Sequence, residues 1–211
     1  IDCHTHRTDA REALIAVDPR QFEPQAGLYY SVGYHPWHDV DRLAQADFDL
    51  LEQCSRHPQV LAIGETGMDS LRGTDLNTQA SVFVRHLQVA HDIGKPVVVH
   101  CVRTAQRIIR ERHQAGLDDV SLAIHGMRAN ERVARSLLDA GCYLSFGIRF
   151  NPATVLATPP DRLLIETDDT TAPIDTIATA VAQVLTLPPQ TLLARATANL
   201  HRLLSTPIPQ H

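Results

Sequence analysis

The chain has 211 residues, of which 44% are hydrophobic and 20% are charged, and its formal net charge is −5. These values predict one globular domain with a sizeable core, spanning 1–211, and exclude fibrous and intrinsically disordered proteins. Acidic side chains outnumber basic ones by 24 to 19, which argues against a broad basic surface for duplex DNA. Apolar runs fall far short of the roughly 18 residues of a membrane-spanning helix, so no membrane segment is expected.

Histidine is abundant, whereas cysteine is dispersed. The 12 histidines accompany only five Phe, four Tyr and one Trp, an excess that directs attention to metal ligands. The four cysteines form no CxxC pair, so neither a zinc knuckle nor a disulfide framework is indicated. Reduced thiols and the absence of a signal-peptide pattern predict a cytoplasmic protein.

Short apolar runs alternate with amphipathic helical segments along the chain. Strands are expected at 1–6, 14–17, 28–34, 60–65, 96–101, 120–125, 142–146 and 162–168. Helices are expected at 41–57, 78–93, 104–115, 131–140, 174–187 and 189–204, with Asn77 and Asn130 placed to cap two of them. This order predicts an α/β fold, a TIM-type (β/α)8 barrel. An open doubly wound sheet is the alternative.

The first two βα units are too short to hold a helix. About seven residues separate the first two strands and about ten separate the next two, whereas a parallel crossover usually needs a dozen or more. The barrel is therefore expected to be trimmed at these two units. The flank beside them is expected to be uncovered and apolar.

Residue types that bind metals stand at the ends of five predicted strands. They are His4 and His6 on the first strand, and Glu65, His100, His125 and Asp168 directly after later apolar runs. In a parallel barrel the carboxyl ends of the strands share one rim, so these side chains should converge. Each alone would be an ordinary hydrogen-bonded or solvated residue. Together, four imidazoles and two carboxylates suffice for two divalent ions about 3.5–4 Å apart.

Six segments resemble, in order, the TatD-type metal-dependent hydrolases. They lie at 2–6, 33–36, 62–69, 95–100, 141–147 and 164–168 and contain HxH, GxHP, GExGxD and ETD motifs, while the tail at 199–203 is similar to the family's closing Asn-x-x-Arg. The resemblance implies the amidohydrolase superfamily, a TIM-type barrel and hydrolysis of phosphodiesters, best known as metal-dependent DNase activity.

The resemblance also implies a role for each candidate ligand. It assigns His4, His6 and Asp168 to a first metal, His100 and His125 to a second, and Glu65 to both as a bridge. Asp168 would accept the proton of the attacking water, so Asp168 and Glu65 are the predicted catalytic residues. Imidazole ligands favour Zn²⁺ or Mn²⁺, whereas the resemblance implies Mg²⁺ for activity.

Three residues are candidates for substrate binding, and each keeps a structural alternative. His35, which matches the GxHP histidine, would either contact a substrate phosphate or cap a turn. Arg103 and Arg128 would either clamp a phosphate or stand exposed at helix starts. Trp37 and His38 would offer a stacking face to a base or simply pack.

Other polar residues are expected to play supporting or surface roles. Asp2 would either orient a ligand histidine or make a structural hydrogen bond, and Glu166 lies one layer below Asp168, where it would support a ligand. The histidines of the predicted helices, His86 among them, are expected on the surface.

The loops after the strands depart from the family's pattern, and this limits the choice of substrate. Arg103 stands one place later than the family's arginine, and the Pro-Tyr-rich segment that commonly follows the ETD motif is missing. A DNA end or a small phosphodiester is the expected substrate. The alternatives are a hydrolase of lactones or amides, and an idle scaffold whose uncovered flank binds a partner, including a second copy in a homo-oligomer.

Overall fold

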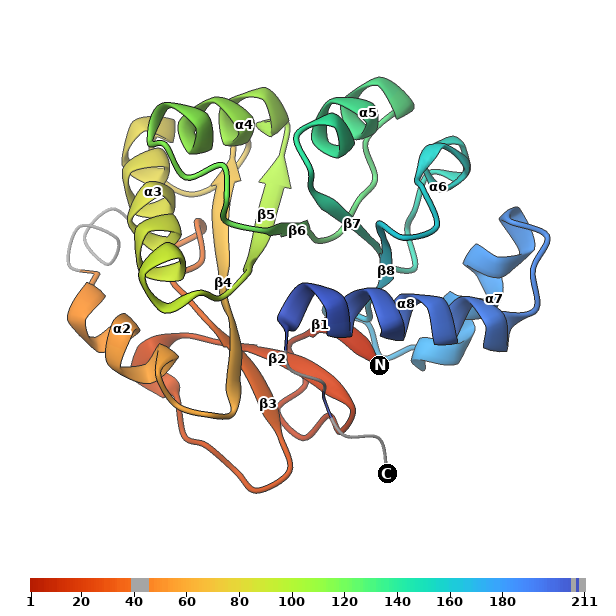
Figure 1. The fold of residues 1–211 in the computed structure, drawn as a ribbon, viewed down its shortest axis with the longest axis horizontal. Coiled ribbons are helices and arrows are strands. Elements are labelled where there is room, and N and C mark those ends of the chain that lie inside the picture. The colour runs from red at the N-terminus through yellow and green to blue at the C-terminus, as the bar shows by residue number, and fades with distance from the viewer. Residues whose placement is uncertain (39–45, 206–207, 209–211) are drawn as a thin grey trace.

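Eight parallel strands follow one another around a barrel (Figure 1). The computed structural model describes residues 1–38, 46–205 and 208. Each strand is hydrogen-bonded to the next, and a parallel bridge between Thr5 and Asp168 joins the last strand to the first. The strands are β1 (Asp2–Thr5), β2 (Ala13–Val17), β3 (Tyr29–Val32), β4 (Val60–Asp69), β5 (Val97–Val102), β6 (Leu122–Ile124), β7 (Tyr143–Phe146) and β8 (Leu163–Ile165). The TIM-type barrel is therefore confirmed, and the open sheet is wrong.

The helices begin at capping side chains that differ in part from those predicted. They are η1 (Pro19–Gln21), α2 (Phe48–Ser55), α3 (Leu76–Ile93), α4 (Ala105–Gln114), α5 (Glu131–Asp139), α6 (Pro152–Ala157), α7 (Ile174–Val184) and α8 (Pro189–Leu204). Asp75, not Asn77, caps α3, because its carboxylate accepts from two backbone N–H groups. Asp47 caps α2, so the predicted helix over 41–57 begins later; its residues 41–45 lie outside the described part. The short α6 was not predicted.

The first two βα units lack an α-helix, as the spacing predicts. No helix separates β1 from β2, and only η1 lies between β2 and β3. Figure 1 shows loops at the lower edge of the view, where β2 and β3 lie. Phe22 of the second loop packs on Tyr30, and Leu28 is buried. Among the described residues, the exposed large hydrophobic side chains lie elsewhere, so the expected apolar flank is wrong.

Strand β4 is longer than predicted and approaches β5 closely. It runs past Glu65 to Asp69, and its pairing with β5 shifts register between Ile63 and Thr66. A Cβ at Gly64 would lie 2.4 Å from the Val98 carbonyl oxygen, and a Cβ at Gly67 would lie 2.1 Å from that of His100. Both glycines have positive φ, which is costly for other residues. The backbones at the centre of the barrel rim therefore touch directly.

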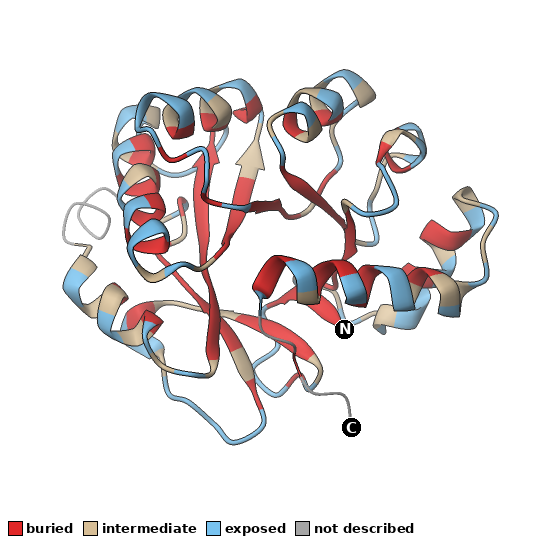
Figure 2. Cartoon of the chain, viewed as in Figure 1, coloured by how far each residue is buried: buried red, intermediate tan, exposed pale blue. Residues whose placement is uncertain are grey.

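In the described part of the chain, the core consists of two apolar clusters. The larger joins the outward faces of the strands to the helices, and the smaller collects side chains from seven strands with Leu200, Leu203 and Leu204 of α8. Figure 2 shows buried strands and helices buried along one side. The Asn199 side chain ties α8 to β8 by donating to the carbonyl of Leu163, which explains the Asn of the closing motif.

No single described helix is long and apolar enough to cross a bilayer. The pair α7 and α8, which is bent by 105° at its junction, reaches the necessary length and apolar composition only when the two helices are taken together.

His86 is buried in α3, so its predicted surface position is wrong. Its Nε2 accepts a hydrogen bond from the Tyr34 N–H at 2.9 Å, and its Nδ1 lies 2.7 Å from the Val82 carbonyl oxygen. Burial lowers the pKa of His86 to about 4, so the imidazole is neutral. The side chain thereby fixes the backbone of the residue that precedes His35. His86 lies four residues after Val82, on the apolar side of the helix, and this spacing indicates burial although histidine is a polar residue type.

We expect His86→Leu to lower the free energy of unfolding by about 1–3 kcal/mol near neutral pH, because the buried Tyr34 N–H loses its acceptor. Below a pH of about 6.5, His86 binds a proton in the unfolded chain but stays neutral in the folded chain. The wild type therefore loses stability as pH falls toward 4. The variant lacks this loss. Urea unfolding should show that the difference in free energy of unfolding between the wild type and His86→Leu becomes smaller as the pH falls. A difference that does not change with pH would contradict a buried, neutral His86. His113→Leu, at the exposed end of α4, is the control.

Candidate metal centre

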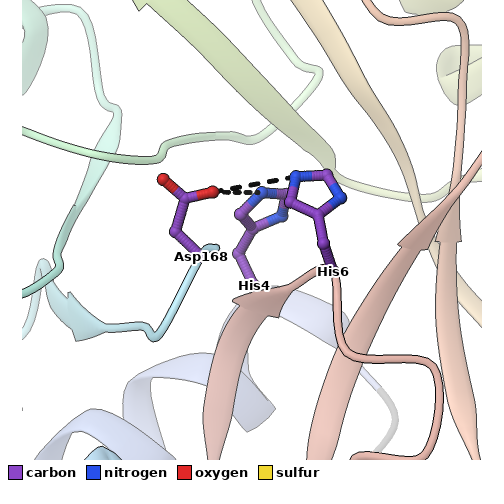
Figure 3. A group of neighbouring side chains, drawn as sticks. All are labelled: His4, His6 and Asp168. Carbon is purple, nitrogen blue, oxygen red and sulfur yellow. Dashed lines mark ion pairs between the residues drawn. The ribbon is translucent and has the colours of Figure 1, made fainter. Parts of the chain in front are cut away.

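The two histidines of β1 and its following loop face a glutamate and an aspartate from other strands. His4 Nε2 and His6 Nε2 lie 3.2 Å and 3.3 Å from Glu65 Oε2. The same nitrogens lie 3.8 Å and 3.7 Å from Asp168 Oδ1 (Figure 3). His4 Nε2 and Glu65 Oε2 are buried without a hydrogen-bond partner. Two ligands of one tetrahedral ion, each about 2.1 Å from it, stand about 3.4 Å apart. The spacing and the unpartnered atoms fit a bound cation.

A second set of imidazoles surrounds the other oxygen of Glu65. His35 Nε2 and His100 Nδ1 each lie 2.9 Å from Glu65 Oε1, and His125 Nε2 lies 2.6 Å from it. His100 Nδ1 and His125 Nε2 are 3.3 Å apart. Each oxygen of the carboxylate thus serves its own group of imidazoles. This is the arrangement expected of a bridging ligand.

All six predicted ligands are therefore brought together, although they come from five strands or strand ends. Among the described residues, four overlapping groups have ligand atoms within 4.8 Å of one another: His4, His6 and Asp168; His4, Glu65 and His125; His35, Glu65 and His100; and His125, Glu166 and Asp168. The groups share members, so this is one continuous cluster rather than separate sites.

Asp168 is fixed in place by the pairing of the first and last strands. Its N–H donates to the His4 carbonyl at 3.0 Å, and its own carbonyl accepts from the His6 N–H at 3.1 Å. These bonds hold it at φ 55°, a conformation that aspartate tolerates better than most residues. Beside it, Asp2 accepts from the Thr167 hydroxyl at 2.6 Å and from the Thr167 N–H at 3.0 Å. Asp2 therefore joins the strands and does not contact a ligand imidazole.

Asp69, whose role sequence reasoning missed, orients His100. Its Oδ2 lies 3.1 Å from His100 Nε2 and accepts from Trp37 Nε1 at 2.7 Å, while its Oδ1 accepts from the Leu71 N–H. Burial disfavours the charge of Asp69, but these hydrogen bonds hold its pKa below the usual range. Asp69 is the final residue of the GExGxD motif, and its place in that motif is the sequence feature that points to a role in the site.

Glu166 supports His125 from below. The carboxylate is fully buried, accepts from the Gly126 N–H at 2.6 Å and lies 3.5 Å from His125 Nδ1. Burial alone would raise the pKa of Glu166, but the interaction with His125 lowers it. A carboxylate behind a ligand imidazole fixes the orientation of the ring.

The carboxylates and imidazoles of the cluster shift one another's pKa values, and the carboxylates favour protonated imidazoles beside them. Burial would raise the pKa of Glu65, but His125, His4 and His100 hold it well below its usual range. Burial would lower the pKa of His125, but Glu65 and Glu166 raise it strongly, and the neighbouring Glu65 carboxylate raises the pKa of His6. The positions that attract protons here are those that a divalent ion would take.

The structure places the predicted substrate residues differently. Arg128 is exposed, and its Nη2 lies 3.9 Å from Asp168 Oδ2, so it borders the cluster. Arg103 is exposed at φ 54°, and no described hydrogen bond or ion pair joins it to the cluster. His35 lies inside the cluster, against Glu65, a contact that neither interpretation of it included. The roles of all three in binding substrate stay predictions.

Comparison with known proteins points to one family. The family model described as TatD related DNase matches residues 20–205. The uncharacterized metal-dependent hydrolase YabD of Bacillus subtilis is 30% identical over 67% of this chain and 58% of its own length. A protein of Cronobacter turicensis named 3'-5' ssDNA/RNA exonuclease TatD is 31% identical over 68% of this chain and 57% of its own. The chain thus spans little more than half the length of these relatives.

A solved structure shares the fold. The TatD homologue YJJV of Escherichia coli K12 superposes with a TM-score of 0.77 at 18% identity, covering 92% of this chain and 86% of that one. The extent of the family-model match, with the barrel and the converging ligand residues, shows that this chain belongs to the TatD-related DNase family.

Proposed function

We propose that this chain is a metal-dependent hydrolase that uses two divalent ions to cleave phosphodiester bonds at a DNA end or in a small phosphodiester. The observation that carries the proposal is the convergence of His4, His6 and Asp168 with Glu65, where two buried ligand atoms lack any hydrogen-bond partner. Relatives named as metal-dependent hydrolases, and one named as an exonuclease of single-stranded DNA and RNA, support it.

Each oxygen of Glu65 would serve one ion. His4, His6 and Asp168 would complete the first site, and His100 and His125 the second. Such ions lower the pKa of a coordinated water and neutralise charge that develops on phosphate oxygens. Imidazole-rich sites favour Zn²⁺ or Mn²⁺, and Mg²⁺ is the third candidate.

Asp168 is suited to accept the proton of an attacking water. Its Oδ1 faces the imidazoles of His4 and His6, whereas its Oδ2 faces the exposed guanidinium of Arg128. The carboxylate is 20% exposed, so a water can reach it. The guanidinium beside Oδ2 would orient a substrate phosphate next to this base.

The carbonyl-directed alternative has less support. In that branch of the superfamily a carboxylated lysine can bridge the metals. The only lysine of the sequence, Lys95, precedes β5 at the opposite end and donates to the carbonyls of Ser55 and Val60. The idle-scaffold alternative requires an exposed apolar flank at the first two βα units, and the described residues there form no such flank. Association into a homo-oligomer stays a prediction.

Zinc should stabilise the wild type against heat, and Glu65→Gln should reduce the increase in melting temperature, because the bridging charge is lost. Circular dichroism melts with a chelator and with excess zinc measure the difference. Glu52→Gln, which alters an exposed glutamate paired with Arg56 in α2, should keep the full increase. An unchanged increase in Glu65→Gln would refute the bridge.

Asp69→Asn should weaken metal binding by about 10–100-fold, because His100 loses the carboxylate that fixes its ring. Titration calorimetry with Zn²⁺ reports the affinity and the number of sites. One of two sites should weaken while the other keeps its affinity, since Asp69 contacts only the second group of imidazoles among the described residues. Equal weakening of both would contradict this division.

Hydrolysis should require a divalent ion and both predicted catalytic carboxylates. We expect Asp168→Asn and Glu65→Gln to lower turnover of 3'-labelled single-stranded DNA and of an aryl phosphodiester by about 10²–10⁴-fold. The neighbouring exposed residue gives the control Asp169→Asn, which should stay active. A lactone tests the alternative reaction. Equal activity in the wild type and both variants would overturn the site assignment.

A further inference from the structure

Trp37 lies at the edge of the metal centre and is partly exposed. It is the only tryptophan of the sequence, and 45% of it is accessible. Its ring meets those of His35 and His100 edge to face, at centroid distances of 4.8 Å and 5.2 Å. Its Nε1–H donates to Asp69, the residue that also holds His100. The indole is therefore exposed yet anchored to the candidate ligands.

Arg72 completes this surface from the loop after β4. Its guanidinium carbon lies 4.6 Å from the centroid of the Trp37 ring. The loop is held by the buried Gln79, whose Nε2 donates to the carbonyls of Arg72 and Thr74. Gly73, which follows Arg72, lies so close to Pro36 that a Cβ at Gly73 would be 2.1 Å from the Pro36 carbonyl oxygen. The backbone before Trp37, at Pro36, is thus packed against the backbone after Arg72, at Gly73.

Single exposed hydrophobic residues are common and need no function. This pair differs because the ring is oriented by a hydrogen bond and a cation, and because it touches a candidate metal ligand. Arg72 makes no ion pair with a carboxylate among the described residues, so its N–H donors are available to an anion. Aromatic surface and free donors beside a phosphate-cleaving site suit a ligand that has both a planar ring and a phosphate.

We propose that Trp37 and Arg72 form a platform that binds a nucleobase of a single-stranded nucleic acid whose scissile phosphate lies at the metal centre. This inference rests on the proposed function and adds the two residues that bind the base of the substrate. The guanidinium already covers one face of the indole, so the base extends this stack, and both groups stack on nucleobases without strong sequence preference. A base is joined to its phosphate through one sugar, so a ring in contact with His100 is within reach of the nucleotide being cleaved.

The fluorescence of Trp37 tests the platform directly, because no other tryptophan contributes. We would titrate the zinc-loaded Asp168→Asn variant of this chain, whose turnover is expected to be about 10²–10⁴-fold lower than that of the wild type, with a short oligothymidylate and with an abasic oligomer of equal length. The oligothymidylate should quench the fluorescence, and the abasic oligomer should not. Arg72→Met in the same background should raise the dissociation constant about tenfold. Arg132→Met, which alters an exposed residue of α5, should leave the dissociation constant unchanged. Equal quenching by both oligomers, or an unchanged constant in Arg72→Met, would overturn the platform.

Kinetics with the same two oligomers separate this inference from the proposed function. Trp37→Ala should lower kcat/KM for the oligothymidylate about tenfold more than for the abasic oligomer. An effect transmitted only through Asp69 and His100 would lower both equally, and that result would refute the platform. If the wild type cleaves neither oligomer with any divalent ion, the proposed function fails, while the fluorescence titration still decides whether the platform binds a base.

Discussion

Two backbone hydrogen bonds, from Asp168 N–H to the His4 carbonyl and from His6 N–H to the Asp168 carbonyl, join the first and last strands of the sheet. Most of the candidate site depends on them. They close the barrel, and they also set the distance between the β1 imidazoles and the Asp168 carboxylate. Because β1 and β8 belong to opposite ends of the chain, the first ligand group exists only when the whole sheet has formed. Folding and site assembly are therefore the same event at this position.

Within the closed barrel, one buried carboxylate determines the chemistry. A lone ionised Glu65 would be expensive to bury, and the surrounding imidazoles make the charge tolerable by supplying positive charge or a cation. The supporting residues act behind these imidazoles: Asp69 behind His100, and Glu166 behind His125. The trimmed units leave this interior arrangement intact, because none of the clustered side chains comes from a helix.

Periodicity predicts the barrel well because the alternation of apolar runs with helical segments agrees with the chemistry of the strand ends. It fails where a local signal is misleading. Glu65 after a glycine resembles the end of a strand, but β4 continues, and so Asp69 was missed. The residue type of His86 predicts a surface position, but its place on the apolar face of the helix buries it. The position of His35 depends on how a loop folds over the rim, and the direction of Arg103 depends on a left-handed backbone. Neither is encoded in a short pattern.

The close approach of β4 and β5 has a consequence for comparing relatives. Gly64 and Gly67 are required because their neighbours' carbonyl oxygens leave no room for a methyl group, whatever the chain does chemically. A homologue that lost its catalytic carboxylates would still have to keep both glycines in order to fold. Shared glycines in the GExGxD motif therefore indicate common architecture only. Inherited activity has to be judged from the acidic residues between and after them.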